Sequence, residues 1–249
     1  MKGSLFASVV RVFSMKFHKL IHVYDGVYAF ITPSEFLKQK LSANGFEEEK
    51  IHCIPTFTAS KTKVGEPQIG SYGLYFGRIT EEKGVETVVQ AYEKLQKYTV
   101  KIMGDDTTEE AIRLKRYIKE HKIKNIEFLG FKSGEELEDI IKGARFTLIP
   151  SIWYDNLPNT ALESFQYSKP VIASNIGSLP ELVVDGENGY LFKPADAEDL
   201  IKKIKLLDDD TVVEKMGAAS RRRLESRFSP ETHYEALMKV FSEAVKNNK

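Results

Sequence analysis

Two short segments contain residues that could bind a charged, hydroxyl-rich ligand. The first is "FGRITEEKG", residues 76–84, in which Arg78 and Lys83 flank a short loop and Gly84 is expected to open a helix. Cations beside a helix N-terminus suit a diphosphate, because the free N–H groups and the helix dipole add to the side-chain charges. A solvated surface loop is the competing interpretation of this segment taken alone.

The second segment is "WYDNLPNTALESF", residues 153–165, which carries an acid in an Asn-Leu-Pro loop region and another in the following helix. Asn159 is expected to cap this helix. Carboxylates beside a diphosphate would repel it, so Asp155 and Glu163 are better suited to accept hydrogen bonds from hydroxyl groups. A nucleoside diphosphate sugar has this layout, with ribose at one end of the pyrophosphate and a sugar at the other. The alternative is a structural role for both acids. Asp155 would then be a turn residue, and Glu163 an acid near a helix start that the helix dipole favours.

Both segments follow apolar runs that are typical of buried strands. The runs predict strands at 73–77, 99–104, 126–130, 145–150, 170–174 and 189–192, buried on both faces of a parallel sheet. The amphipathic segments around them predict helices at 84–96, 108–121, 135–143, 159–168 and 196–207. This alternation predicts a Rossmann-like, doubly wound α/β sheet, in which ligands bind outside the carboxyl ends of the strands.

The chain is expected to have three parts. Residues 1–57 would form a partial N-terminal α/β segment, with helices at 4–24 and 33–45 and strands at 27–32 and 50–55. Residues 58–228 would form the ligand-binding domain, and the polar stretch 56–71 is the best linker candidate. Residues 229–249 would form a final helix, which starts after Ser229-Pro230.

The composition narrows the classes of function. The 249 residues include 36 basic and 36 acidic side chains, so the chain lacks the basic excess typical of nucleic-acid-binding domains. Cys53 is the only cysteine, which precludes an internal disulfide and is consistent with a reducing compartment. No apolar run approaches the roughly 20 residues of a membrane-spanning helix, and Arg11 interrupts the apolar N-terminal stretch. We expect a cytoplasmic protein that binds no nucleic acid.

Neither a metal nor a cofactor is expected. The acids in "GDDTTEE", residues 104–110, are explained by the dipole of the helix that they start. The histidines show no spacing typical of metal ligands. A dinucleotide-dependent dehydrogenase is disfavoured because no G-x-G-x-x-G follows any expected strand.

Several motifs, in order, resemble a known family. "YFGRITEEKG" and the long segment from "PSIWYDNLPNTALESF" to "FKPADAEDL" are similar to the nucleotide-binding half of the retaining glycosyltransferases of family 4, which have the GT-B fold. The resemblance covers about residues 70–226. It implies that Arg78 and Lys83 neutralise the diphosphate leaving group, that Glu163 binds the ribose and that Asp155 faces the transferred sugar.

The resemblance also implies donor contacts from the surrounding loops. They are Gly77 after the first strand, Gly130 and Phe131 near the base, main-chain groups of Asn156, Leu157 and Pro158 beside the sugar, and those of Thr160 and Ala161 beside the phosphate. One position departs from the family, which usually has Glu where this chain has Asp155. Asp is about 1.5 Å shorter, and a shift near 1 Å in a catalytic site can reduce the rate about a hundredfold.

The implied activity is metal-independent transfer of a hexose from a UDP- or GDP-sugar, with retention, to a glycan or lipid-linked acceptor. Residues 1–57 resemble only the tail of the family's acceptor-side half, so we expect a separate N-terminal half or self-association to complete the site. The basic amphipathic helix at 4–24 could lie on the inner face of a membrane, and packing against protein is the alternative. A second hypothesis for the chain is a catalytically silent nucleotide-sugar-binding or assembly module.

Overall fold

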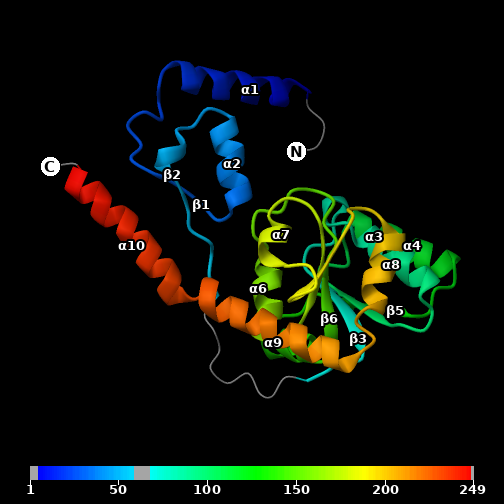
Figure 1. Ribbon diagram of the computed structural model, residues 1–249. Helices are drawn as coiled ribbons and strands as arrows, with labels where there is room; N and C mark the ends of the chain where they lie inside the picture. The colour runs from blue at the N-terminus through cyan, green and yellow to red at the C-terminus, as the bar shows by residue number, and fades with distance from the viewer. Residues whose placement is uncertain (1–4, 59–67, 248–249) are drawn as a thin grey trace.

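A computed structural model describes residues 5–58 and 68–247, and its centre is a parallel sheet (Figure 1). The six strands pair in the order β5-β4-β3-β6-β7-β8. In chain order they are β3 (Tyr72–Phe76), β4 (Val100–Met103), β5 (Ile126–Gly130), β6 (Ala144–Ile149), β7 (Val171–Ser174) and β8 (Gly189–Phe192). The order reverses between β3 and β6, as in a doubly wound sheet. The predicted α/β fold and its strands are confirmed.

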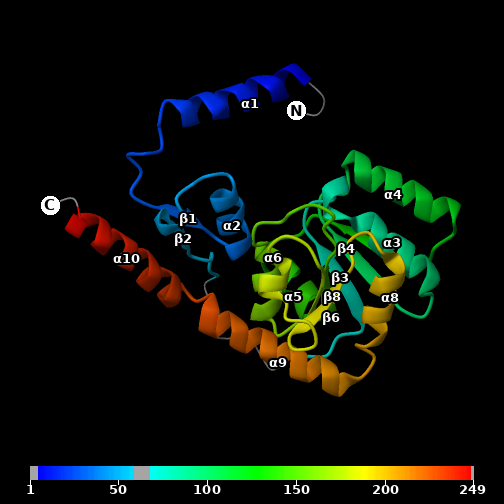
Figure 2. The same ribbon diagram turned by 45° about the horizontal axis from the view of Figure 1, so that its top comes forward.

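Helices cover both faces of this sheet (Figure 2). One face packs against α3 (Val85–Lys94), α4 (Glu109–Glu120) and α8 (Ala197–Lys205), and the other against α5 (Gly134–Lys142), α6 (Asn159–Gln166) and α7 (Leu179–Leu182). The long helix α9 (Asp210–Arg227) contributes buried side chains to both sides. The sequence analysis predicted neither α7 nor α9.

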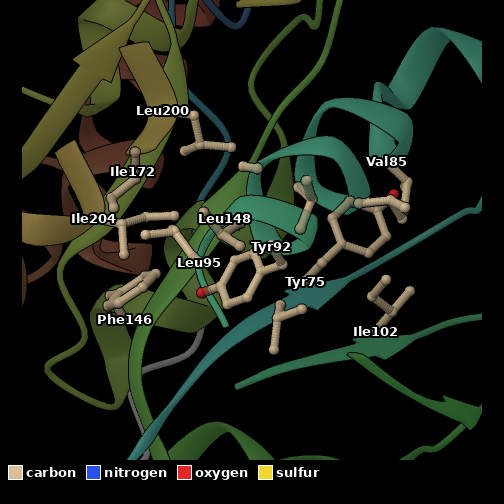
Figure 3. Close-up of a cluster of buried hydrophobic side chains, with 14 of the residues drawn as sticks. Tyr75, Val85, Tyr92, Leu95, Ile102, Phe146, Leu148, Ile172, Leu200 and Ile204 are labelled. Carbon is tan, nitrogen blue, oxygen red and sulfur yellow. The ribbon is translucent and has the colours of Figure 1, made fainter. Parts of the chain in front are cut away.

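The main core lies between the sheet and the helices α3, α4 and α8. Figure 3 shows part of it, where Tyr75, Ile102 and Leu148 from the strands meet Tyr92 from α3 and Leu200 from α8. All five are at most 3% exposed. Burial of each large apolar side chain contributes about 1.5–3 kcal/mol. The strand ends are therefore fixed, and the loops that follow them start from rigid points.

The N-terminal unit, residues 5–58, has its own small sheet. Its elements are α1 (Leu5–Leu20), β1 (Phe30–Thr32), α2 (Glu35–Ala43), the 3₁₀ turn η1 (Glu48–Lys50) and β2 (Ile51–Cys53). Strands β1 and β2 pair in parallel, separately from the large sheet. Burial, together with the nearby Glu35 carboxylate, raises the pKa of the half-buried Cys53 thiol to about 12.

Helix α1 lies apart from the rest of the chain in both views (Figures 1 and 2). Its side chains Val9, Val12, Phe13, Phe17 and Leu20 are between 44% and 75% exposed. The predicted amphipathic helix is therefore present with its apolar face uncovered by the described part of the chain.

The final helix α10 (Pro230–Asn247) begins beside the N-terminal unit. The Thr58 N–H donates to the Phe228 carbonyl at 3.3 Å, and the His233 ring Nδ1 lies 2.7 Å from the Pro55 carbonyl oxygen. Most of the predicted linker, residues 59–67, lies outside the described residues, as do 1–4 and 248–249. The division at residues 57 and 228 remains a prediction.

A buried lysine ties the start of the large domain to its core. The Lys169 ammonium, just before β7, donates to the carbonyls of Gln68 and Lys142, both at 2.6 Å. Lys142 ends α5, so the cation also meets the negative end of a helix dipole. Burial lowers the pKa of Lys169 to about 8.

Candidate functional site

A cavity of about 450 Å³ opens at the carboxyl ends of β3, β4 and β5. Its lining includes Ile79, Thr80, Gly104, Asp105, Thr108 and Lys132, together with the predicted site residues Gly77, Arg78, Phe131, Thr160 and Glu163. A slightly larger depression of about 520 Å³ lies on α9 around Arg222 and Arg223, away from these strand ends. The 450 Å³ cavity adjoins the switch point between β3 and β6, where doubly wound sheets bind ligands.

The loop after β3 holds the backbone of Arg78 and leaves its side chain exposed. The buried Tyr75 phenol donates to the Arg78 carbonyl oxygen, and burial raises the pKa of that phenol above its ordinary value. The next residue, Ile79, is fully buried. Anchored on both sides, Arg78 is directed into the cavity by a loop with little freedom.

Gly84 allows the loops after β3 and β6 to meet. It ends the 3₁₀ turn η2 (Glu81–Lys83) and precedes α3, with a left-handed φ of 66°. A Cβ atom there would lie 2.0 Å from the Pro150 carbonyl oxygen, so only glycine fits. The two loops also share a hydrogen bond, from the Ile152 N–H to the Glu82 carbonyl at 3.0 Å. This contact brings Lys83 next to Asp155.

Arg78 and Glu163 line the same cavity, and neither side chain makes a hydrogen bond or ion pair with another described residue. Burial raises the pKa of the Glu163 carboxyl group. A cation and a half-buried carboxylate that are both free to take a ligand fit the predicted diphosphate and ribose contacts.

Lys83 and Asp155 form an ion pair with each other beside the cavity. The Lys83 ammonium donates to one Asp155 carboxylate oxygen, and the Ser151 hydroxyl donates to the other. The two charged side chains are only 19% and 17% exposed. The Asp155 main chain is held as well, because the Ser178 hydroxyl donates to its carbonyl at 2.7 Å. Neither charged residue is part of the cavity lining.

Helix α6 begins at Asn159, as the predicted range 159–168 has it, but its N-cap differs from the predicted one. Pro158 is its N-cap and Asn159 its first residue, so the prediction that Asn159 caps the helix is wrong. The proline ring fixes φ near −65°, which suits entry into a helix. No described side chain caps this end, which leaves N–H groups beside Thr160 at the cavity. The Ala161 N–H already donates to the Pro158 carbonyl at 3.1 Å.

The loop before α6 carries a strained residue. Leu157 has a φ of 105°, which costs a non-glycine residue about 1–3 kcal/mol. Its side chain packs into the core formed with Ala161 and Leu162, and this packing retains the conformation. Its neighbour Asn156 is exposed and accepts a hydrogen bond from the Ser34 hydroxyl at 3.1 Å.

The loop after β5 supplies an aromatic ring at the cavity. Gly130 ends the strand and accepts a hydrogen bond from the Gly104 N–H at 3.1 Å. Phe131 lines the cavity with 74% of its surface exposed. The adjacent Lys132 was not predicted, although its position after Phe131 was a usable signal.

Ser151 and Ser178, which hold Asp155, carried no recognisable signal in the sequence.

Among residues 5–58 and 68–247, no three or more histidine, cysteine or acidic side chains cluster closely enough to hold a metal ion. Within the same ranges, no helix has both the length and the apolar character needed to cross a membrane.

Comparison with known proteins identifies a family. Residues 57–223 match the family model of the group 1 glycosyl transferases. An uncharacterized glycosyltransferase of Methanocaldococcus jannaschii is 28% identical over 173 residues, which are 70% of this chain and 48% of that protein. Glycogen synthase of Mycobacterium tuberculosis is 28% identical over 198 residues, or 78% of this chain and 46% of that enzyme. The chain spans about half the length of these curated relatives.

Solved structures share the fold. A glycosyltransferase from Rickettsia africae superposes with a TM-score of 0.81 at 22% identity, covering 91% of this chain and 67% of that one. HepE of Anabaena, in complex with UDP and glucose, superposes with a TM-score of 0.77 at 18% identity, covering 86% and 63% of the two chains.

Proposed function

Because the chain belongs to the group 1 glycosyl transferases, we propose that it is the donor-binding part of a retaining hexosyltransferase. It takes a UDP- or GDP-hexose as donor and a glycan or lipid-linked molecule as acceptor. One observation carries the proposal. A cation, Arg78, and a carboxylate, Glu163, both line one cavity at the carboxyl ends of the strands, and neither is bonded to another described side chain.

The parts of the donor are assigned along the cavity. Glu163 accepts hydrogen bonds from the ribose hydroxyls, and Phe131 stacks on the base. Arg78 and the uncapped start of α6 contact the diphosphate. Lys83 reaches the diphosphate after leaving Asp155, which then accepts hydrogen bonds from the sugar. The complexes of HepE with UDP and with UDP-glucose support a nucleoside diphosphate sugar as the ligand class.

The reaction breaks the bond between the anomeric carbon and the diphosphate oxygen and forms a bond from that carbon to the acceptor hydroxyl oxygen. Negative charge develops on the departing diphosphate, and the proton of the acceptor hydroxyl passes to an oxygen of that diphosphate. Arg78, Lys83 and the N–H groups of α6 stabilise this charge without a metal. The configuration of the product, read by NMR, tests retention.

The first experiment is calorimetric titration with UDP, GDP, ADP and their hexose conjugates, with EDTA present throughout. We expect one nucleotide to bind selectively. Arg78→Ala and Lys83→Ala should each weaken binding about tenfold or more, since a close charge pair contributes a few kcal/mol. Arg116→Ala, which removes an exposed cation from α4, is the control. Unchanged affinity in both site variants would refute the diphosphate assignment.

A catalytically silent binding module is the second candidate, favoured by one observation. Both Asp155 carboxylate oxygens are occupied, by Lys83 and by Ser151. Binding without turnover or hydrolysis of the donor, even with a candidate N-terminal half added, would support this alternative.

The acceptor site and its location belong to the same proposal. A separate N-terminal half, or a second copy of the chain, completes the acceptor side beside the N-terminal unit.

The uncovered apolar face of α1, with Arg11 and Lys16 on the same helix, lies on the inner face of a cytoplasmic membrane. Flotation with phosphatidylglycerol vesicles, compared with phosphatidylcholine vesicles, tests the membrane contact. Equal flotation or none would refute a charge-dependent contact.

A further inference from the structure

The N-terminus of α2 binds the side chain of Glu181 on α7. The N–H groups of Glu35 and Phe36 donate to the two Glu181 carboxylate oxygens, at 2.8 and 2.7 Å. The free N–H groups and the dipole at a helix start favour an anion there. The Arg223 guanidinium donates to the main-chain carbonyl of Glu181 at 2.6 Å. Glu181 therefore links the N-terminal unit to the large domain at a fixed point.

The same helix start contacts the loop between β6 and α6. The Ser34 hydroxyl, fully buried, donates to the Asn156 side-chain oxygen at 3.1 Å and accepts from the Leu37 N–H at 3.2 Å. One side chain thus caps α2 and holds the residue next to Asp155.

An aromatic contact extends this interface. The rings of Phe36 and Tyr154 lie 4.9 Å apart, and the Lys40 ammonium lies 5.3 and 5.2 Å from their centres. Tyr154 immediately precedes Asp155, so the loop is held by α2 on both sides of that acid.

The turn before α7 holds Asp155 from the other direction. Ser178 donates to the Asp155 carbonyl from both its hydroxyl and its N–H, at 2.7 and 3.3 Å. The segment 154–156 is therefore clamped between α2 and the start of α7, and Glu181 fastens these two helices together. None of the hydrogen bonds in this clamp involves Arg78 or Glu163.

We propose that Glu181 is a positioning residue that couples docking of the N-terminal unit to the geometry of Asp155, and hence to binding of the donor sugar. The inference rests on the proposed function. With α2 docked, the loop presents Asp155 to the sugar. When α2 is released, the diphosphate and ribose contacts remain and the sugar contact is lost.

The test compares Glu181→Ala, Glu181→Gln and Ser34→Ala with the control Glu198→Ala, which removes an exposed carboxylate paired with Lys94 far from the clamp. Affinities for UDP, UDP-glucose, GDP and GDP-mannose are measured by calorimetry. We expect Glu181→Ala to weaken binding of the hexose conjugate about tenfold, because a displaced loop misplaces Asp155. Binding of the plain nucleotide should change less than about twofold, since Arg78 and Glu163 lie outside the clamp.

The conservative and double variants sharpen the comparison. Glu181→Gln keeps one acceptor oxygen and should restore part of the sugar affinity. The losses of sugar affinity caused by Glu181→Ala and Ser34→Ala should not add in the double variant, because both substitutions act through the same docked helix.

Trp153 supplies a readout that needs no ligand, because it is the only tryptophan of the chain and adjoins Tyr154. We expect time-resolved fluorescence anisotropy to show faster local motion of Trp153 in Glu181→Ala and Ser34→Ala than in Glu198→Ala. If Glu181→Ala does not fold, Ser34→Ala serves as the test by the same measurements.

Two results would overturn the inference. One is an equal loss of affinity for the plain nucleotide and for its hexose conjugate, which indicates a general structural role. The other is unchanged anisotropy of Trp153 in the folded Glu181 and Ser34 variants. If the unchanged protein binds none of the nucleotides, the proposed donor function fails, and the anisotropy comparison still decides whether Glu181 holds the loop.

Discussion

At the residue scale, Glu163 carries a charge that its surroundings do not compensate. Its carboxylate is half-buried without a partner among the described residues, and burial raises its pKa. A ribose diol would supply the missing hydrogen-bond donors. The folded protein thus retains a group that is unfavourable for stability and suited to a ligand.

We predict that Glu163→Gln weakens nucleotide binding and raises the melting temperature at neutral pH. Above the ordinary pKa of 4.5 the unfolded chain loses this proton before the folded protein does, so the carboxyl group lowers stability as pH rises. The stability gain of the variant should therefore be larger at pH 8 than at pH 4.5, measured by circular dichroism. A gain that is the same at every pH would contradict this origin.

Phe131 offers a separate test, of the base contact. Stacking of an aromatic ring on a base contributes about 1–3 kcal/mol. Phe131→Ala should therefore weaken nucleotide binding about fivefold or more and leave binding of inorganic pyrophosphate unchanged. Phe241→Ala, which removes an exposed ring from α10, is the control. Equal effects on nucleotide and pyrophosphate would place Phe131 away from the base.

At the element scale, strands and most helices followed from local patterns, whereas the contacts between loops did not. The runs that became β3 to β8 are short, rich in β-branched or aromatic residues and bounded by glycine or proline, which is a local signal. Helix α9 was missed because Gly217 and three consecutive arginines obscure its apolar face. A Cβ at Gly217 would lie 2.2 Å from the Ser168 carbonyl oxygen, so packing accounts for this glycine.

The candidate site shows the same division between local and long-range information. Arg78, Phe131 and Glu163 were predicted and share one cavity. The pairing of Lys83 with Asp155 joins residues 72 positions apart, and no local pattern encodes it. It depends on the close approach of two loops that the glycine at the start of α3 permits.

We predict that the contribution of Lys169 to stability depends on pH. Its pKa near 8 in the folded protein, against 10.5 ordinarily, means that the unfolded chain binds more protons between these pH values. The free energy of unfolding of the wild type, relative to that of Lys169→Met, should therefore increase with pH. The increase between pH 8 and 10.5 should reach up to about 3 kcal/mol. Urea unfolding at pH 7.5 and 10 measures this difference, with Lys205→Met on the exposed end of α8 as control. A pH-independent difference would show that Lys169 titrates normally.

At the scale of the whole molecule, apolar surface is concentrated on the N-terminal unit and α10. Besides the uncovered face of α1, Tyr234, Phe241 and Val245 on α10 are 51% to 63% exposed. Exposed apolar surface of this kind marks contact with a membrane or another protein, or a tendency to self-associate. The cavity at the carboxyl ends of the strands lies on the large domain, and neither α1 nor α10 contributes to its lining.

We predict that deletion of residues 1–20, which removes α1, reduces self-association and leaves nucleotide affinity unchanged. Helix α1 lies apart from the large domain, so its loss removes apolar surface without disturbing the cavity (Figure 1). Sedimentation velocity across a range of concentrations measures the first effect, and calorimetry the second. Loss of nucleotide binding on deletion would contradict the separation of the two regions.

The half-buried thiol of β2 has a practical consequence for experiments in solution. At a pKa of about 12, the thiolate fraction of Cys53 at neutral pH is about a thousandfold below that of an ordinary cysteine. Maleimide dyes react with thiolates, so they leave the only native cysteine largely unlabelled. Two cysteines introduced on the surface, one on α2 and one on α8, can then carry a donor and an acceptor dye in the otherwise natural sequence. Single-molecule energy transfer between them would report whether the N-terminal unit moves relative to the large domain.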